Sequence, residues 1–345
     1  MFHARAARIN GNPRGARGPV KHSGKAGPAI PQDLDRGPRP PQAHVVRHEL
    51  EVLGPLDLEL TFTCGQAFRW RREGGAWSGV IGEAEARVEA LPGGRLLVET
   101  RGGAVGREAL RRYLRLDEDP RTHLAGAEDL LGIPGFTGLL GLRLLRQDPW
   151  ETLATFICSA AANVRKITGC VEGLSARFGE PIEGSARRRF PSSERLARTR
   201  EEDLRALGLG FRAPYVRETA RRIAASGMDW DALRGMEYEA ARAALVELPG
   251  VGRKIADCTL LFGLDRLEAW PVDRWIRRAT REISTRRNAR DEELERWAER
   301  LGPGRGYLQQ VLFHLRRTGG PLPPLPKPAR ARPAPARASG RGRTA

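Results

Sequence analysis

Hydrophobic and polar residues alternate with a period of two between His48 and about Arg101. The alternation runs through "ELEVLGPLDLEL" and again through "WSGVIGEAEARVEAL", and the "PGG" at 92–94 predicts a turn into "RLLVET". A period of two is typical of strands that turn one face to the core. We therefore expect an antiparallel sheet with one covered face, in a β-rich N-terminal domain of residues 47–118.

The period then lengthens to that of helices. "REALRRYLRL" (107–116) predicts a short amphipathic helix, and "DPWETLATFICSA" (148–160) begins a strongly apolar one. Asn163 is a suitable N-cap for the next helix, and Thr199 with Glu202 has the pattern of a capping box. Further helical segments are "APYVRETARRIAAS", "EYEAARAALVEL", "DEELERWAERL" and "GYLQQVLFHLRR". Strands followed by seven or more helices predict an α+β fold, with a helical domain of residues 119–319.

Most of the formal net charge of +17 lies in the two ends of the chain. Residues 1–46 and 320–345 each carry +6, so the body between them carries only +5. Both ends consist mainly of Pro, Gly, Ala and Arg, and we expect them to be disordered because they contain almost nothing to bury. Two interpretations stay open. The ends are an electrostatic tether to nucleic acid, or they are tails without a selected role or, at the N-terminal end, the product of a misassigned start codon.

The composition argues against several classes of protein. No apolar run approaches the roughly 18 residues of a membrane span, and the N-terminus lacks the apolar segment of a secretory signal. Cysteines 64, 158, 170 and 258 are far apart and show no CxxC spacing, which argues against structural zinc, a cysteine-ligated iron–sulfur cluster or a disulfide framework. We expect a monomer that acts in the cytoplasm, at the nucleoid if the source is bacterial, and not at a membrane.

A glycine-rich turn between two helical segments carries the first candidate chemistry. "ELPGVGRKIADCTLLFGL" (247–264) places Pro-Gly-Val-Gly before an apolar helix, which predicts a helix-hairpin-helix over about 237–263. Gly250 and Gly252 can adopt dihedrals closed to other residues and leave no Cβ in the way. The amides of Gly250, Val251, Gly252 and Arg253 can then approach a DNA phosphate. Alone, the motif also fits a plain connection between helices.

Two residues next to this turn suggest a reaction. Lys254 opens the second helix of the hairpin, and Asp273 in "WPVDRW" is placed to cap the next helix. Each residue alone is as well explained by a solvated lysine or an ordinary cap. Together they provide a nucleophile and an anionic stabiliser beside DNA. A neutral lysine amine can attack C1′ of a nucleotide as the base departs and form a Schiff base, while a carboxylate offsets oxocarbenium-like charge.

These residues resemble the helix-hairpin-helix/Gly-Pro-Asp signature of base-excision DNA glycosylases. More narrowly, most of Glu49–Arg317 resembles the 8-oxoguanine DNA glycosylase family, in the segments "CGQAFRW" (64–70), "WSGVI" (77–81), "LLRQDPWETLATFICSAAANVRKITG" (144–169), "LGLGFRAPYV" (207–216), the hairpin and "QQVLF" (309–313). The resemblance implies a sheet packed on a helical bundle, double-stranded DNA containing oxidised guanine as the partner, and a damaged base flipped into a pocket. The implied activity is bifunctional, with base removal followed by strand cleavage.

The resemblance also assigns roles to residues. Lys254 becomes the Schiff-base nucleophile and Asp273 its acidic partner. The carbonyl of Gly65 accepts the N7 proton found only on the oxidised base. The flipped ring is sandwiched and read by Phe313, Cys258 and Gln309, the last at its Watson–Crick edge. No cofactor and no side-chain metal site is implied, although the hairpin carbonyls can hold a monovalent cation, as in related folds.

The departures from the family fall on the side of the opposite base. Eukaryotic members read the orphaned cytosine with an Asn and two Arg, and wedge the gap with an Asn and a Tyr. Here the Asn position is Ala161, and the DNA-contacting positions are Asn163, Lys166 in place of one Arg, Phe211 in place of the Tyr, and Arg212 as the second Arg. We expect a relaxed preference for cytosine opposite the lesion, because Lys lacks the fork that grips a base edge. Trp275 stands where many relatives have a phosphate-facing His.

Two other functions stay open at this point. One is a related glycosylase for alkylated bases, oxidised pyrimidines or mismatched adenine. Alkyl-base and adenine members generally lack the hairpin Lys, and pyrimidine and adenine members usually carry a four-Cys cluster, which argues against this alternative. The other is a DNA-binding module without catalysis, which would need neither Lys254 nor Asp273.

Overall fold

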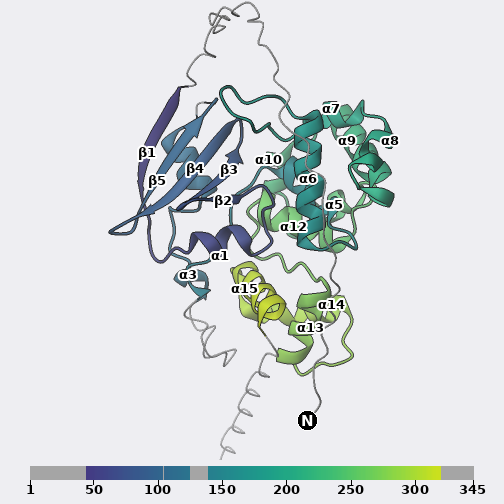
Figure 1. Ribbon diagram of the computed structural model, residues 1–345. Helices are drawn as coiled ribbons and strands as arrows, with labels where there is room; N and C mark the ends of the chain where they lie inside the picture. Colours follow the sequence, from purple (N-terminus) through teal and green to yellow (C-terminus); the bar gives the residue numbers. More distant parts are fainter. Residues whose placement is uncertain (1–43, 104, 125–138, 320–345) are drawn as a thin grey trace, which may run out of the picture. The chain divides into compact units, whose positions relative to one another are not determined.

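The computed structural model describes residues 44–103, 105–124 and 139–319, and the expected disordered ends lie almost wholly outside these ranges. It has the predicted α+β fold (Figure 1). Five strands form one sheet in the order β1-β5-β4-β3-β2, with every neighbouring pair antiparallel. The strands are β1 (Val45–Glu51), β2 (Arg71–Glu73), β3 (Ala76–Ile81), β4 (Ala84–Leu91) and β5 (Arg95–Arg101). The first strand begins two residues inside the N-terminal segment that we expected to be disordered.

The sheet follows from the period-two pattern. On β4 the alternate residues Ala84, Ala86 and Val88 are fully buried, and Leu96 and Val98 of the paired strand β5 face the same core. The predicted turn joins these strands, with Leu91 opposite Arg95. Both glycines of the turn have positive φ, 77° and 70°, which only glycine adopts readily.

One part of the alternating stretch is a helix and not a strand. Helix α1 (Leu58–Thr63) lies where "DLEL" continued the alternation. Asp57 caps it, its Oδ1 accepting from the Leu60 amide at 2.9 Å, and Pro55 precedes it. The period-two prediction was wrong here because a short apolar stretch fits both structures and the cap decides between them.

The remainder of the described chain is mainly helical. The α-helices are α2 (Arg107–Tyr113), α3 (Arg121–Leu124), α5 (Pro149–Cys158), α6 (Val164–Phe178), α7 (Ser193–Ala197), α8 (Glu201–Ala206), α9 (Ala213–Ser226), α10 (Trp230–Gly235), α11 (Tyr238–Val246), α12 (Arg253–Gly263), α13 (Arg274–Ile283), α14 (Asp291–Ala298) and α15 (Arg305–Thr318). Two short 3₁₀ turns are η2 (Gly210–Arg212) and η3 (Glu299–Leu301). The pair α11–α12 forms the predicted helix-hairpin-helix.

Three predicted helix starts can be compared with the structure. Asn163 caps α6 and Asp273 caps α13 through their side chains, as the sequence indicated. The capping box at Thr199 is wrong. Helix α8 begins after Arg200, and the Thr199 hydroxyl instead donates to the Arg195 carbonyl at the end of α7, at 3.0 Å. The preceding helix thus engages the hydroxyl that the box would have used.

Two hydrophobic cores share helix α1. Leu60 packs in the core of the helices, and Phe62 packs in the core of the sheet. Phe62 stacks on Trp70 with ring centroids 4.0 Å apart, and the Trp70 indole lies so close to Gly79 that a Cβ there would come within 2.5 Å of it. The loop between α1 and β2, which contains Gly65, is therefore anchored by aromatic packing on the sheet.

Gly79→Ala should lower the free energy of unfolding by about 1–3 kcal/mol, because the added methyl displaces Trp70 from a filled core. Gly75→Ala is the matched control, since its Cβ would meet nothing within 4 Å. We expect the control to stay within about 0.5 kcal/mol of the wild type in urea denaturation. Equal stability of the two variants would contradict this packing.

Candidate active site

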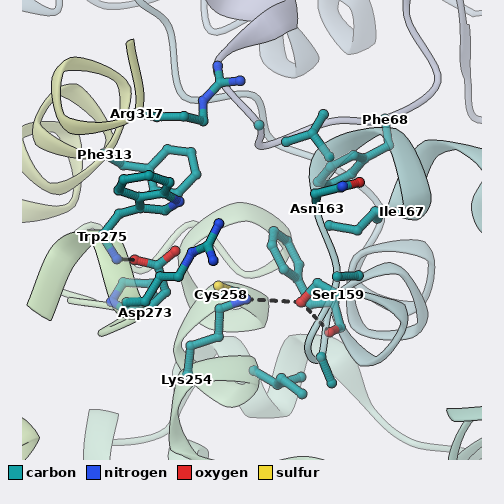
Figure 2. A pocket seen from close by; sticks show the side chains of 18 of the residues that line it. Phe68, Ser159, Asn163, Ile167, Lys254, Cys258, Asp273, Trp275, Phe313 and Arg317 are labelled. Atoms are coloured by element: carbon teal, nitrogen blue, oxygen red, sulfur yellow. Dashed lines mark hydrogen bonds between the residues drawn. The ribbon is translucent and has the colours of Figure 1, made fainter. Parts of the chain in front are cut away.

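A cavity of about 1130 Å³ lies among helices α5, α6, α12, α13 and α15. Figure 2 shows its lining side chains. Eight sequence-predicted site residues line it, namely Lys254, Asp273, Gly65, Cys258, Gln309, Phe313, Asn163 and Gly252. The other predicted residues, Lys166, Phe211, Arg212, Gly250, Val251 and Arg253, do not line it. The structure thus gathers the residues expected at the lesion in one place, although 248 positions separate Gly65 from Phe313.

Lys254 reaches into this cavity from the first turn of α12. Its Nζ donates to Oγ of Ser159 at 3.0 Å and lies 4.9 Å from the centre of the Phe156 ring. Cys258 follows one turn later on the same face of the helix. Burial raises the pKa of the Cys258 thiol to about 12, although the nearby Lys254 ammonium lowers it. The thiol is therefore a neutral packing group at neutral pH.

Asp273 lines the same cavity from the N-terminus of α13. Its Oδ1 accepts from the amides of Trp275 and Ile276, both at 2.8 Å. These two bonds fix the carboxylate and leave its second oxygen without a partner among the described residues. Within the described chain, no ion pair joins Asp273 to Lys254. The carboxylate is thus held by the backbone and is available for charge that develops in the cavity.

The loop that carries Gly65 is held by buried amide side chains. Gln66 donates to the carbonyls of Thr61 and Arg143 and accepts from the Leu145 amide. Gln310 of α15 donates to the Cys64 carbonyl at 2.9 Å. Gly65 has a φ of 95°, and a Cβ there would come within 3.1 Å of the Phe313 ring. Glycine is therefore required at this position for both its conformation and its close approach to an aromatic wall.

Gln309 and Phe313 lie on the cavity side of α15. The Gln309 amide donates to the Pro271 carbonyl at 3.0 Å, and its Oε1 is buried without a hydrogen-bond partner among the described residues. A buried acceptor without a partner is costly, so Oε1 is placed to receive N–H groups of a bound molecule. The Arg317 guanidinium lies 5.8 Å from the centre of the Phe313 ring and donates to the Thr63 carbonyl.

The hairpin has the expected glycines, with one difference. Gly250 has a φ of 75° and lies against the Tyr215 ring, where a Cβ would clash at 2.6 Å. Gly252 is in the ordinary extended region, so it is not needed for its dihedral angles, and no atom lies near its missing Cβ. Val251 is buried in the core, which leaves only its backbone for a phosphate, and Arg253 is paired with Glu295.

The residues expected on the side of the opposite base lie outside the cavity, apart from Ala161 and Asn163. Asn163 uses its Oδ1 to cap α6, and the Lys166 ammonium lies over Gly208. Phe211 is 54% exposed, as a wedge must be. Arg212 is buried, with Nε on the Ala160 carbonyl at 2.5 Å and Nη1 on the Leu209 carbonyl at 3.1 Å. In this structure Arg212 thus holds the loop that follows α5.

Sequence reasoning did not assign a role to several residues of the cavity and its walls, among them Phe156, Ser159, Gln66, Gln310 and Arg317. Gln66 and Ser159 both lie inside segments that carried the family resemblance. The sequence signal that could have identified Gln66 and Ser159 as site residues is a polar residue within an otherwise apolar segment, the same signal that identified Lys254.

A buried ionic cluster ties helix α12 of the hairpin to α11 and α14. The fully buried Asp257 of α12 accepts from the Tyr238 hydroxyl at 2.7 Å and lies 3.5 Å from Arg242 of α11. Arg242 also pairs with Glu295 of α14 at 3.1 Å, and Glu295 binds Arg253 as well. Burial raises the pKa of the Asp257 carboxyl to about 6, although the Tyr238 hydroxyl and Arg242 lower it.

Comparisons with known proteins agree with this fold and site. Residues 51–153 match the 8-oxoguanine DNA glycosylase N-terminal domain, and residues 154–303 match the HhH-GPD superfamily of base-excision DNA repair proteins. A probable N-glycosylase/DNA lyase of Methanothermobacter thermautotrophicus is 35% identical over 303 residues, which are 77% of this chain and 96% of the relative. An N-glycosylase/DNA lyase of Arabidopsis thaliana is 35% identical over 245 residues, 63% of each chain.

A solved structure shows the same fold. The Clostridium acetobutylicum 8-oxoguanine glycosylase/lyase, in complex with double-stranded DNA containing cytosine opposite 8-oxoguanine, superposes with a TM-score of 0.71 at 26% identity. The match covers 79% of this chain and 97% of that one. Fold and site therefore define a helix-hairpin-helix glycosylase of base-excision DNA repair. Within that class, the chain belongs to the 8-oxoguanine DNA glycosylase family, which confirms the resemblance drawn from the sequence.

Two features are absent from the described residues. No helix there has the length and apolarity that crossing a bilayer requires. No cluster of three or more His, Cys, Asp or Glu side chains in the described ranges is arranged to hold a metal ion.

Asp257→Asn should change how stability depends on pH. A carboxyl with a pKa near 6 in the folded state and about 4 when unfolded stabilises the protein below about pH 4, and this stabilisation is lost as the pH rises through 6. Relative to the wild type, the variant should therefore gain stability between about pH 4 and 6, by on the order of 1–3 kcal/mol. Urea denaturation at several pH values measures the difference. Asp231→Asn, at an exposed ion pair, is the control. A difference that does not vary with pH would refute the assignment.

Proposed function

We propose that this protein is a bifunctional glycosylase/lyase that removes 8-oxoguanine from double-stranded DNA. The observation that carries the proposal is the placement of Lys254. Its amine enters a cavity large enough for a base, and the Asp273 carboxylate and the Gln309 acceptor belong to the same lining. A binding module without catalysis has no need for this arrangement.

The chemistry follows from these groups. The lone pair of the neutral Lys254 amine attacks C1′, and the bond between C1′ and N9 of the base breaks. The departing base takes up a proton and the nitrogen loses one, which leaves a neutral secondary amine on C1′. Its lone pair then forms the C=N bond as the C1′–O4′ bond breaks and O4′ takes up a proton, which gives the protonated imine. Loss of a C2′ proton then expels the 3′ phosphate. Asp273, held by two backbone amides, stabilises positive charge on the sugar as the base leaves.

The same cavity supports recognition of an oxidised guanine. Because the Gln309 amide donates to Pro271, its Oε1 faces the ligand as an acceptor, which suits the N1–H and N2–H of a guanine ring and not adenine N1. The Gly65 carbonyl is the proposed acceptor for N7–H, which unoxidised guanine lacks. One buried hydrogen bond of this kind discriminates by about 1–3 kcal/mol. Cys258 and Phe313 would enclose the ring from its two faces.

We infer that the protein binds DNA as a monomer in the cytoplasm, or at the nucleoid of a bacterium, without a cofactor. The groups needed for the proposed reaction lie around one cavity of one chain. All four cysteines are free and buried, which suits a reducing compartment. The hairpin amides supply the proposed phosphate contact, with any monovalent cation confined to its backbone carbonyls.

Lys254→Gln should abolish covalent trapping. Borohydride reduces an imine to a stable protein–DNA adduct, so wild-type protein incubated with a duplex holding 8-oxoguanine opposite cytosine should give the adduct and the variant none. Lys166→Gln removes the same charge outside the cavity and should still form it. Base removal by wild type without trapping would disprove the lyase step alone. If wild-type protein binds the duplex but leaves the 8-oxoguanine in place, either 8-oxoguanine is not the substrate or the protein only binds DNA.

We further propose that the preference for cytosine opposite the lesion is relaxed. Ala161, at the position of the cytosine-reading Asn, has a φ of 50°, a left-handed conformation that Asn tolerates far better than Ala. The loop has thus retained the backbone suited to Asn without its side chain. Arg212, the second expected reader, is turned to the carbonyls of Ala160 and Leu209.

Ala161→Asn should raise the preference for cytosine over adenine by about tenfold, because one hydrogen-bonding group is worth about 1–3 kcal/mol. It should also stabilise the fold by about 0.5–1 kcal/mol, because the left-handed strain is relieved. Single-turnover excision rates opposite each base, and urea denaturation, measure the two effects. Ala161→Gly separates the effect on stability from the effect on selectivity, because it relieves the backbone strain without adding a side chain that can bond to cytosine. A wild-type preference as strong as that of the Asn variant would refute the proposal.

A further inference from the structure

Ser159 provides a fixed hydrogen-bond acceptor for the amine of Lys254. It caps the C-terminus of α5, and its Oγ lies 2.6 Å from the Phe156 carbonyl oxygen and 3.0 Å from Nζ of Lys254 (Figure 2). A carbonyl oxygen can only accept, so the single hydroxyl hydrogen is donated to Phe156. The Oγ can then offer Lys254 only lone pairs. The direction of the hydrogen bond is therefore settled: Nζ donates and Ser159 accepts.

The other neighbours of Nζ cannot replace this contact. The Phe156 ring, 4.9 Å away, attracts a cation but no longer holds the nitrogen once it is neutral. The Cys258 thiol stays protonated at neutral pH. No carboxylate of the described chain lies within ion-pair distance of Lys254, and Asp273 is held by α13. Ser159 is the one of these contacts that is equally suited to the ammonium and to the neutral amine.

We propose that Ser159 is a positioning residue for the nucleophile, an inference that rests on the proposed function. It retains one N–H of the nitrogen when the ammonium loses its proton, so the lone pair cannot rotate toward the serine and is confined to directions away from it. A lysine side chain otherwise samples many rotamers, and fixing the attacking atom before reaction is a major source of rate enhancement. The backbone of α5 thereby fixes the orientation of the Lys254 side chain on α12.

The test measures imine formation on a duplex with a preformed abasic site, which bypasses base recognition. Ser159→Ala should slow borohydride trapping by about tenfold or more, because the amine loses its fixed orientation. Affinity for a duplex with a tetrahydrofuran abasic analogue, which cannot form an imine, should stay within about twofold of wild type. Ser159→Thr keeps the hydroxyl and should restore most of the rate. A purely structural role would not separate rate from affinity in this way.

Ser226→Ala is the matched control. Ser226 also ends a helix and donates to the carbonyl three residues back, but it contacts no lysine. The Ser226→Ala variant should form the borohydride-trapped adduct at the wild-type rate. The proposal is overturned if Ser159→Ala traps within about twofold of wild type, if it loses affinity as much as rate, or if Ser159→Thr is as slow as Ser159→Ala. If wild type itself forms no adduct on the abasic duplex, the proposed function fails and the role of Ser159 with it.

Discussion

Helix α12 is buried from Ile255 to Gly263, and this burial determines where the polar groups of the site can lie. An ionisable group on such a helix needs a partner inside the protein, because water cannot reach it. Asp257 finds its partners in Tyr238 and Arg242, so the hairpin is tied to α11 and α14. Lys254, at the open end of the helix, finds Ser159. One buried helix thus fixes both the hairpin turn, the proposed phosphate contact, and Lys254, the proposed nucleophile.

The walls of the cavity are held by hydrogen bonds from side chains to backbone carbonyls, and few charges take part. Gln66, Gln309 and Gln310 each donate an amide N–H to a carbonyl that is distant in sequence. Such bonds fix a loop without bringing a second charge near the reacting atoms, where it would alter the field that the carboxylate provides. In the chain without DNA, the loops on this side of the cavity are therefore already held in place by these bonds.

The parts of this site that sequence alone predicted are those encoded locally. The caps at Asn163 and Asp273, the hairpin glycines and the lysine that opens α12 each follow from residues within a few positions of one another. Ser159 and Gln66 act across 95 and 77 positions of sequence, to Lys254 and to Arg143, so no local pattern could indicate their partners. Helix α1 was mistaken for a strand because its short apolar pattern fits both periods until the cap at Asp57 is considered.

The two sides of the site differ in how strongly the fold constrains them. On the lesion side, Gly65, Gln309 and Lys254 are each fixed by backbone conformation or by a hydrogen bond to another element. On the opposite side, the Ala161 side chain is exposed, and Arg212 holds the loop through the Ala160 carbonyl. A substitution such as Asn to Ala therefore costs the fold only local backbone strain and leaves the nucleophile in place. If Lys254 is the nucleophile, as proposed, opposite-base selectivity can change along this loop while the chemistry stays the same, because Arg212 holds the loop and Lys254 is held separately by Ser159.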